Sequence, residues 1–232
     1  MACFNAAINL NDSDARFYFA KGSTLMDLNQ HQNALEYLEK AISLDSNNSD
    51  YFYKKAFCLN FLKRFEESLI FFDFAINLNQ NNEHYFFNKG LALFHLQRAE
   101  ESEENFLKAL ELNSKNIECL NKLAEVQLYL NKPDQAIKYY EIIQKLDPKN
   151  LMYYDKKALI LVMHNMNEEA LKCFSLAAEL SPDDPKYYES QGYIYLKMNL
   201  KEKALQSFKK CLKIDPNHEK ALENIKSLKE KM

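Results

Sequence analysis

Glycine, proline and closely spaced cysteines are scarce in this sequence, and each scarcity excludes a class of protein. Among 232 residues there are only 3 Gly and 5 Pro, too few for the frequent turns of an all-β fold. No two glycines stand close together, which excludes a glycine-rich phosphate-binding loop. The 5 cysteines include no CxxC pair, so we expect neither a zinc knuckle nor a redox motif. The composition therefore favours a helical protein.

Further absences concern membranes, secretion and nucleic acids. No apolar run approaches the ~18 residues that a membrane span requires. The N-terminus has neither a basic region nor a long apolar segment, so it does not resemble a secretory signal. A net charge of −3 gives no general reason to bind nucleic acid. We expect a cytoplasmic protein with reduced thiols, no nucleic-acid partner and no membrane contact.

Side chains that carry catalysis or bind metals form no recognisable site. His84 and His95 share one predicted helix but stand ~16 Å apart along its axis, too far for a single metal ion. Neither HExxH nor GxSxG occurs in the sequence. We therefore expect no enzyme activity, no cofactor and no bound metal.

A period of 34 residues runs through the chain without insertion or deletion. Position 8 of each unit is small and holds every glycine, and position 20 is small as well, whereas positions 4 and 24 are bulky. Positions 4, 8 and 11 share one face of a first helix, and positions 20, 24 and 27 share one face of a second. Counted from Ala15, the six units are 15–48, 49–82, 83–116, 117–150, 151–184 and 185–218.

This pattern resembles the tetratricopeptide repeat family over residues 15–218. The resemblance implies an all-α solenoid, in which antiparallel helix pairs stack into a right-handed α-α superhelix. Its concave face is lined chiefly by the first helices. Departures are modest: Ser46, Gln80 and Ser114 replace the proline that ends the later units. Unit 4 has Gln127 at position 11 and Ile143 at position 27, which predicts less regular packing there.

Both ends of the chain carry partial units. Residues 1–14 fit the second helix of a repeat whose first helix is missing, which indicates a fragment of a longer repeat protein. A deliberately short capping helix is the alternative. Residues 219–232 are predicted to form a C-terminal capping helix, because an array otherwise exposes the apolar face of its last repeat.

One face of the first helices is more aromatic than stacking requires. Most of the 16 phenylalanines, all but Phe174 and Phe208, lie before residue 117. Positions 2, 5, 9, 12 and 13 point away from positions 4, 8 and 11, which pack against the second helix. In units 1–3 they nevertheless form an apolar strip, which indicates a binding surface. Ordinary packing between repeats is the alternative. The apolar members of this strip are Phe19, Met26, Tyr53, Phe57, Phe61, Phe87, Leu91 and Phe94.

Polar residues run beside the aromatic strip. Lysine ammonium groups there are suited to an acidic-hydrophobic peptide, with plain solubility as the alternative reading. Position 7 carries Lys21, Lys55, Lys89 and Lys157. The polar residues assigned to the groove itself are Lys54, Asn60, Asn88, Lys122 and Lys156.

One subclass of the family can be tested directly. The resemblance implies that family members which bind chaperone tails hold two carboxylates of the tail in a clamp. The clamp consists of Lys and Asn in one repeat, Asn in the next, and Lys and Arg in the third. Read from unit 1, the corresponding residues here are Phe19, Ser23, Lys54, His84 and Asn88. Later frames also fail, so we do not expect this chain to bind chaperone tails.

The sequence thus predicts a protein-interaction scaffold that binds a peptide or helix of a partner protein in its concave groove. The partner segment is expected to be hydrophobic and acidic, and the chain to be a monomer rather than a homo-oligomer. Two alternatives remain. One is a structural or self-associating module of a larger assembly, such as a ciliary, centriolar or cytoskeletal particle. The other is a regulatory region of a longer enzyme.

Overall fold

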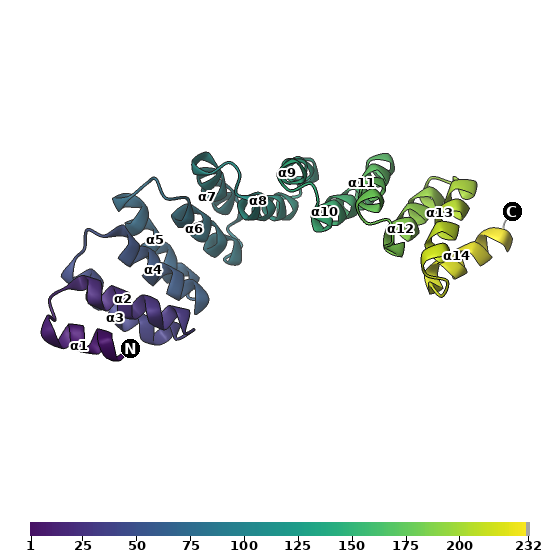
Figure 1. Cartoon of the computed structure of the whole chain (residues 1–232). Helices are drawn as coiled ribbons and strands as arrows, with labels where there is room; N and C mark the ends of the chain where they lie inside the picture. Colours follow the sequence, from purple (N-terminus) through teal and green to yellow (C-terminus); the bar gives the residue numbers. More distant parts are fainter. Residues whose placement is uncertain (231–232) are drawn as a thin grey trace. The chain divides into compact units, whose positions relative to one another are not determined.

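First helices of 13 residues alternate with second helices of 14 residues through the six central units of the chain. A computed structural model describes residues 1–230, and in that part the chain consists of α-helices joined by short turns (Figure 1). The 34-residue units defined above are called repeats from here on. Contacts between Cα atoms divide the chain into two larger compact units, each spanning several repeats. Unit 1 spans Met1–Asn131, and unit 2 begins at Lys132.

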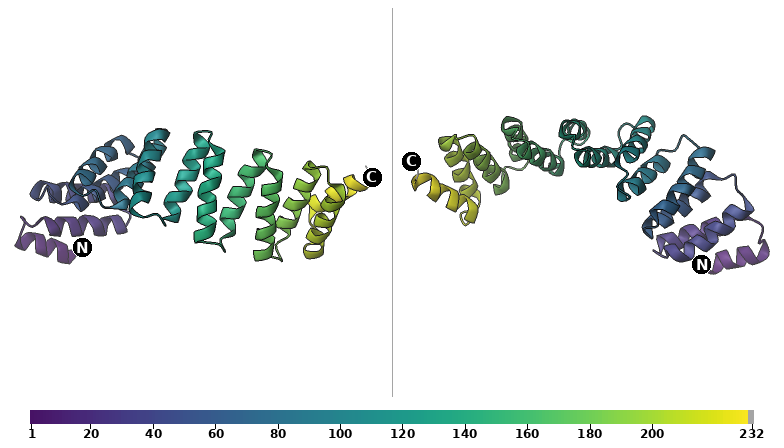
Figure 2. Two further views of the ribbon diagram at one scale, coloured as in Figure 1. Left: turned by 90° about the horizontal axis from the view of Figure 1, so that it is seen from above. Right: turned by 180° about the vertical axis from the view of Figure 1, so that it is seen from behind.

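Unit 1 contains eight helices, and each packs against its neighbour along the chain (Figure 2). The contact between α4 and α6 also brings two first helices together directly, which positions the groove described below. The helices are α1 (Ala2–Leu10), α2 (Ala15–Asp27), α3 (His31–Leu44), α4 (Ser49–Phe61), α5 (Phe65–Leu78), α6 (Glu83–His95), α7 (Ala99–Leu112) and α8 (Ile117–Tyr129).

Unit 2 repeats the same arrangement within residues 132–230. Its second helices end two residues before Pro148, Pro182 and Pro216, consistent with a residue that cannot continue a helix. The helices are α9 (Pro133–Leu146), α10 (Leu151–Met163), α11 (Asn167–Leu180), α12 (Pro185–Lys197), α13 (Lys201–Ile214) and α14 (Glu219–Glu230).

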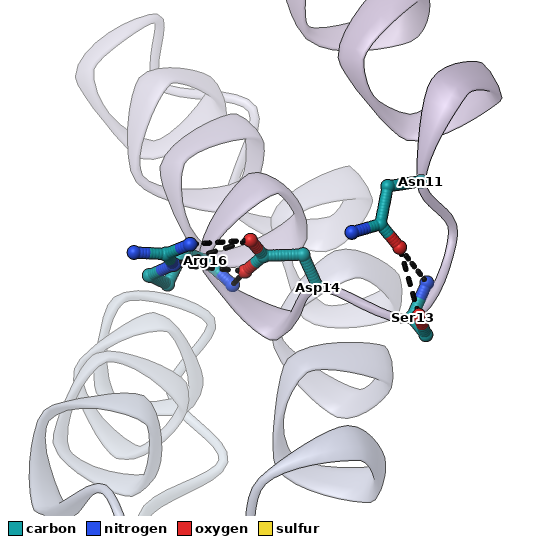
Figure 3. Close-up of polar contacts among 4 residues, drawn as sticks. All are labelled: Asn11, Ser13, Asp14 and Arg16. Atoms are coloured by element: carbon teal, nitrogen blue, oxygen red, sulfur yellow. Dashed lines mark hydrogen bonds and ion pairs between the residues drawn. The ribbon is translucent and has the colours of Figure 1, made fainter.

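Side-chain caps fix where most first helices begin. At the start of α2 the Asp14 carboxylate accepts a hydrogen bond from the backbone N–H of Arg16 at 3.0 Å and also pairs with its guanidinium (Figure 3). In the preceding turn the Asn11 side-chain carbonyl accepts from the N–H and hydroxyl of Ser13. Such caps satisfy N–H groups that have no partner inside the helix. Asn48, Asn82, Asn116 and Asp184 cap α4, α6, α8 and α12 in the same way.

The turns between first and second helices need a left-handed residue and obtain it without glycine. In residues 1–230 six non-glycine residues have positive φ, all between 57° and 61°. Asparagine tolerates this conformation better than other side chains, and it occupies four of the positions. The other two, which are less favourable, are Lys63 and Gln97.

The core of each repeat is built from the small side chains at positions 8 and 20 and the bulky side chains at positions 4 and 24. Positions 20 and 27 are fully buried in all six repeats, from Ala34 and Ala41 to Ala204 and Cys211. A small residue at position 8 lets the large side chain at position 24 approach the first helix. At Gly192 a Cβ atom would lie only 2.6 Å from the Phe208 ring, which shows how close this approach is.

Gln127 in α8 is the clearest irregularity of the core. It is only 1% exposed, and neither its amide nitrogen nor its amide oxygen has a hydrogen-bond partner. Repeats 1, 2, 3 and 5 carry a buried leucine at this position. An unpartnered buried amide is costly, so the departure noted in the sequence corresponds to a local weakness.

The terminal helices differ in how well they are packed. No residue of α1 is buried, although Lys21 of α2 donates to the Asn5 side-chain carbonyl at 2.6 Å. At the other end Ala221 and Leu228 bury α14 against α13. The sequence predicted a capping helix over 219–232. Its last two residues lie outside the described part of the chain.

Candidate functional site

A groove of about 590 Å³ lies in unit 1 between the first helices α4 and α6. Tyr53, Phe57 and Phe61 follow one another along α4, with ring centres 6.0 Å and then 5.1 Å apart. Phe87 and Leu91 face them from α6. These side chains all belong to first helices. Tyr53 and Phe87 also contact Phe72 and Phe106 on the second helix of their own repeat. The groove is therefore formed in part by side chains that also pack within a repeat.

Exposure differs along the aromatic row. Phe61 is 57% exposed and stacks on His31 at 4.3 Å between ring centres. Phe57 is half-buried and packs against the buried cluster that includes Leu59. Phe87 is buried and touches Phe106 of α7. Phe61 is thus the most exposed of the three rings, while Phe57 and Phe87 also support the fold.

Two amide side chains hold the wall of the groove in place. The Asn88 amide donates to the Tyr53 hydroxyl at 3.2 Å and to the backbone carbonyl of His84 at 2.9 Å. The Asn60 amide donates to the backbone carbonyl of Asn88 at 3.2 Å, which links α4 to α6. The side-chain carbonyl of Asn60 has no hydrogen-bond partner and so remains an acceptor in this wall.

Tyr53 keeps its proton under all ordinary conditions. Burial raises the pKa of its hydroxyl to about 12, and the neighbouring Tyr85 and Asp50 act in the same direction. The hydroxyl therefore stays neutral and can accept the hydrogen bond from Asn88 while presenting its ring to the groove.

Lysine and histidine side chains outnumber carboxylates around the groove. Lys63, His84 and His95 line it, against a single carboxylate, Glu118. Lys54, one residue along α4 from Tyr53, forms no ion pair with any residue of the described chain. The rim therefore has cationic groups that no internal carboxylate neutralises.

The structure brings together seven of the twelve residues that the sequence assigned to the groove: Tyr53, Phe57, Asn60, Phe61, Phe87, Asn88 and Leu91. The other five do not line it. Phe19 contacts Tyr51 in a tilted arrangement at 4.8 Å between ring centres, and Phe94 contacts Tyr129 edge-on at 6.1 Å. Lys122 forms an ion pair with Glu125 on its own helix, and Lys156 belongs to unit 2. Lys54 flanks the groove.

The lysines at position 7 have a different role from the one suggested by the sequence. Lys55 pairs with Glu39 at 2.9 Å, and Lys89 pairs with Asp73 at 2.6 Å. Lys21 lies 4.0 Å from the ring centre of Tyr37. In each case the partner is on the second helix of the same or the preceding repeat, so these side chains hold helices together.

Sequence reasoning missed five lining residues for two reasons. His84, His95 and Glu118 occupy positions 2 and 13 of the outward face, but as polar residues they interrupt the aromatic strip that predicted the groove. Lys63 and Phe65 come from the turn and the start of the second helix. A rule based on first helices alone does not reach them.

Residues 1–230 contain neither a metal-binding cluster nor a membrane-spanning helix. No group of three or more His, Cys, Asp or Glu side chains is placed to hold a metal ion. None of the helices in this range combines the length and apolar character needed to cross a membrane.

An all-α superhelical repeat with an apolar groove on its first helices defines a class of protein, the protein-interaction scaffold. The chain belongs to the tetratricopeptide repeat family: models of this repeat match residues 15–48, 83–116, 185–218 and 121–185. Proteins of this family in general bind protein or peptide partners. A comparison with curated protein sequences finds no significant match.

Solved structures with the same fold share little sequence with this chain. YrrB, described as a TPR protein with an unusual peptide-binding site, is 24% identical over 82% of this chain and 97% of its own, with a TM-score of 0.63. The C-terminal part of a TPR repeat-containing protein from Cytophaga hutchinsonii is 15% identical over 97% and 92%, with a TM-score of 0.81. MamA is 20% identical over 75% and 94%, with a TM-score of 0.68. At these identities the likeness concerns the fold.

Proposed function

We propose that the groove between α4 and α6 binds an extended or helical segment of a partner protein. The observation that carries the proposal is Phe61, a large aromatic side chain that is 57% exposed and forms one wall of an apolar recess. Contiguous apolar surface of this kind marks interaction sites, and aromatic side chains contribute much of the binding free energy when a partner covers them.

The chemistry of the rim favours an acidic and hydrophobic partner segment. Lys54 and Lys63 form no ion pair with the described residues, and His84 and His95 add further nitrogen donors. Carboxylates of a ligand can meet these groups while its apolar side chains fill the space beside Phe61. Such pairs at a rim direct orientation and association more than they add affinity.

Phe61→Ala tests peptide binding by the groove better than a triple variant of Tyr53, Phe57 and Phe87. Replacing Tyr53, Phe57 and Phe87 together removes side chains that also pack against Phe72, Leu59 and Phe106, so a loss of binding after that change has two explanations. Phe61→Ala removes a ring that is 57% exposed and contacts only the rings of His31 and Phe57 among the aromatic side chains. Phe74→Ala on α5 is the matched control, because Phe74 is 49% exposed and does not line the groove.

The experiment is a selection from a random peptide library displayed on phage. Peptides that bind the unaltered protein are expected to be rich in Leu, Ile, Phe, Asp and Glu. Phe61→Ala is expected to abolish their binding, Phe74→Ala to leave it unchanged, and Lys54→Glu with Lys63→Glu to reverse the preference for acidic residues. If the selected peptides bind Phe61→Ala as well as the unaltered protein, this groove is not the site.

Two further expectations belong to the same proposal, a monomeric state and a cytoplasmic location. Light scattering over a concentration series tests the first. A constant mass favours the peptide-binding scaffold, and a mass that rises with concentration favours the alternative of a self-associating structural module.

A further inference from the structure

A second recess, of about 340 Å³, lies within unit 2 between the first helices α10 and α12, with Phe174 of α11 at its back. Leu159 and Tyr193 form its mouth and are 61% and 50% exposed. Phe174 occupies repeat position 24, where five of the six side chains are almost completely buried and Phe174 is not. The recess therefore exposes a side chain at position 24, which is buried in the other five repeats.

Two carboxylates stand at the other end of this unit 2 recess, and neither is fully satisfied. Asp155 accepts a hydrogen bond from Lys186 Nζ through Oδ2 at 2.6 Å, but its Oδ1 has no partner. The basic side-chain atoms nearest to Glu189 are His218 Nε2 at 3.7 Å and Lys220 Nζ at 3.9 Å. Both distances exceed that of a hydrogen bond, and Lys220 is largely exposed.

The lining of the recess accordingly carries a net negative charge, from Asp155 and Glu189 against Lys186. Lys186 is the single ammonium group in the lining, and it is already committed to Asp155. Glu189 is about one quarter exposed, so its carboxylate is partly removed from water without receiving a hydrogen bond in return. A cationic donor supplied by a ligand would satisfy it.

We propose that the unit 2 recess binds a protein segment in which a leucine or similar aliphatic side chain stands next to an arginine or lysine. The aliphatic side chain fills the space between Leu159, Phe174 and Tyr193. The neighbouring cation pairs with Glu189. This preference is opposite in charge to the one proposed for the groove in unit 1, and it rests on different residues.

The test uses three synthetic peptides that differ only in the residues on either side of one leucine, which are Arg, Gln or Glu. Binding is followed on the full chain by NMR chemical shifts of α10 and α12. The Arg peptide is expected to bind about fivefold more tightly than the Gln peptide, the size of effect typical of one partly exposed ion pair. The Glu peptide is expected to bind most weakly.

Variants separate the charge from the apolar contact. Glu189→Gln is expected to remove the preference for Arg over Gln, and Leu159→Ala to weaken binding of all three peptides. Glu223→Gln on the exposed side of α14 and Phe61→Ala in unit 1 are matched controls that should change neither. The proposal is wrong if no peptide gives saturable shifts, if the Glu peptide binds best, or if Glu189→Gln leaves the preference intact. None of these results bears on Phe61.

Discussion

Lys89 Nζ donates a hydrogen bond to Asp73 Oδ1 at 2.6 Å across 16 residues, and so joins α6 to the second helix of the preceding repeat. The same spacing recurs between Lys157 and Glu141 at 2.9 Å. In the last repeat a neutral hydrogen bond takes the place of the ion pair: the Gln191 amide donates to the Ser175 hydroxyl at 3.3 Å. Position 7 of one repeat thus contacts position 25 of the repeat before it, whatever the charge of the two side chains.

A double-mutant cycle on this pair should give a small coupling energy. Lys89→Met keeps the apolar stem, and Asp73→Asn keeps the shape of the carboxylate. Because Asp73 is more than half exposed, we expect a coupling of about 0.5 kcal/mol, smaller in high salt. Denaturant unfolding measures it. Lys108 and Glu111, an exposed pair within α7, should give less, and a larger value there would contradict the argument.

Glycine at position 8 is needed in some repeats more than in others. Gly192→Ala places a Cβ 2.6 Å from a rigid ring, and we expect a loss of about 1–2 kcal/mol after the helix-propensity gain of alanine is included. Gly22→Ala meets the more adaptable Leu38 at 3.0 Å and should be close to neutral. Thermal unfolding of both variants compares them. Gly192→Ala combined with Phe208→Leu should recover part of the loss.

Gln127→Leu should stabilise the protein. The substitution removes two unpartnered polar atoms from a buried position and restores the leucine found in four other repeats. We expect a gain of about 1–3 kcal/mol in the free energy of unfolding. The control is Gln135→Leu at an exposed position of α9, which should gain nothing. An unchanged melting temperature for Gln127→Leu would show that the amide is satisfied in solution.

Gln97 is strained by its backbone conformation. Its φ of 61° lies in the left-handed region, where four of the equivalent turns have asparagine. Gln97→Asn should therefore raise the stability by about 0.5–1 kcal/mol, and Gln97→Gly should act in the same direction. Gln135→Asn, inside a helix where asparagine is the poorer choice, should lower it slightly. Calorimetry of the three variants distinguishes these outcomes.

The five cysteines should differ sharply in reactivity. Burial raises the pKa of the Cys58 and Cys119 thiols to about 12 and that of Cys211 to about 11, so little thiolate forms near neutral pH. Cys3 is exposed. Alkylation followed by mass spectrometry should show one fast site, Cys3, and four that react only when their unit opens. Fast reaction at Cys58 in the folded protein would mean that α4 is poorly packed.

Much of the fold follows from periodicity in the sequence. An unbroken 34-residue period places a small side chain at position 8 opposite a large one at position 24, and only two packed helices satisfy both. Composition added that little interrupts the helices, because the chain has only 3 Gly and 5 Pro. These are local patterns repeated six times, which is why they could be recognised without coordinates.

Which residues form the groove was decided by the tertiary structure. Periodicity assigns Phe61, Phe87 and Phe94 to the same outward face, yet one is exposed, one is buried and one contacts Tyr129. The sequence of a helix specifies the direction of each side chain about its own axis. It does not specify how closely the next helix approaches, and that distance determines whether a ring at the face meets water or a neighbouring side chain.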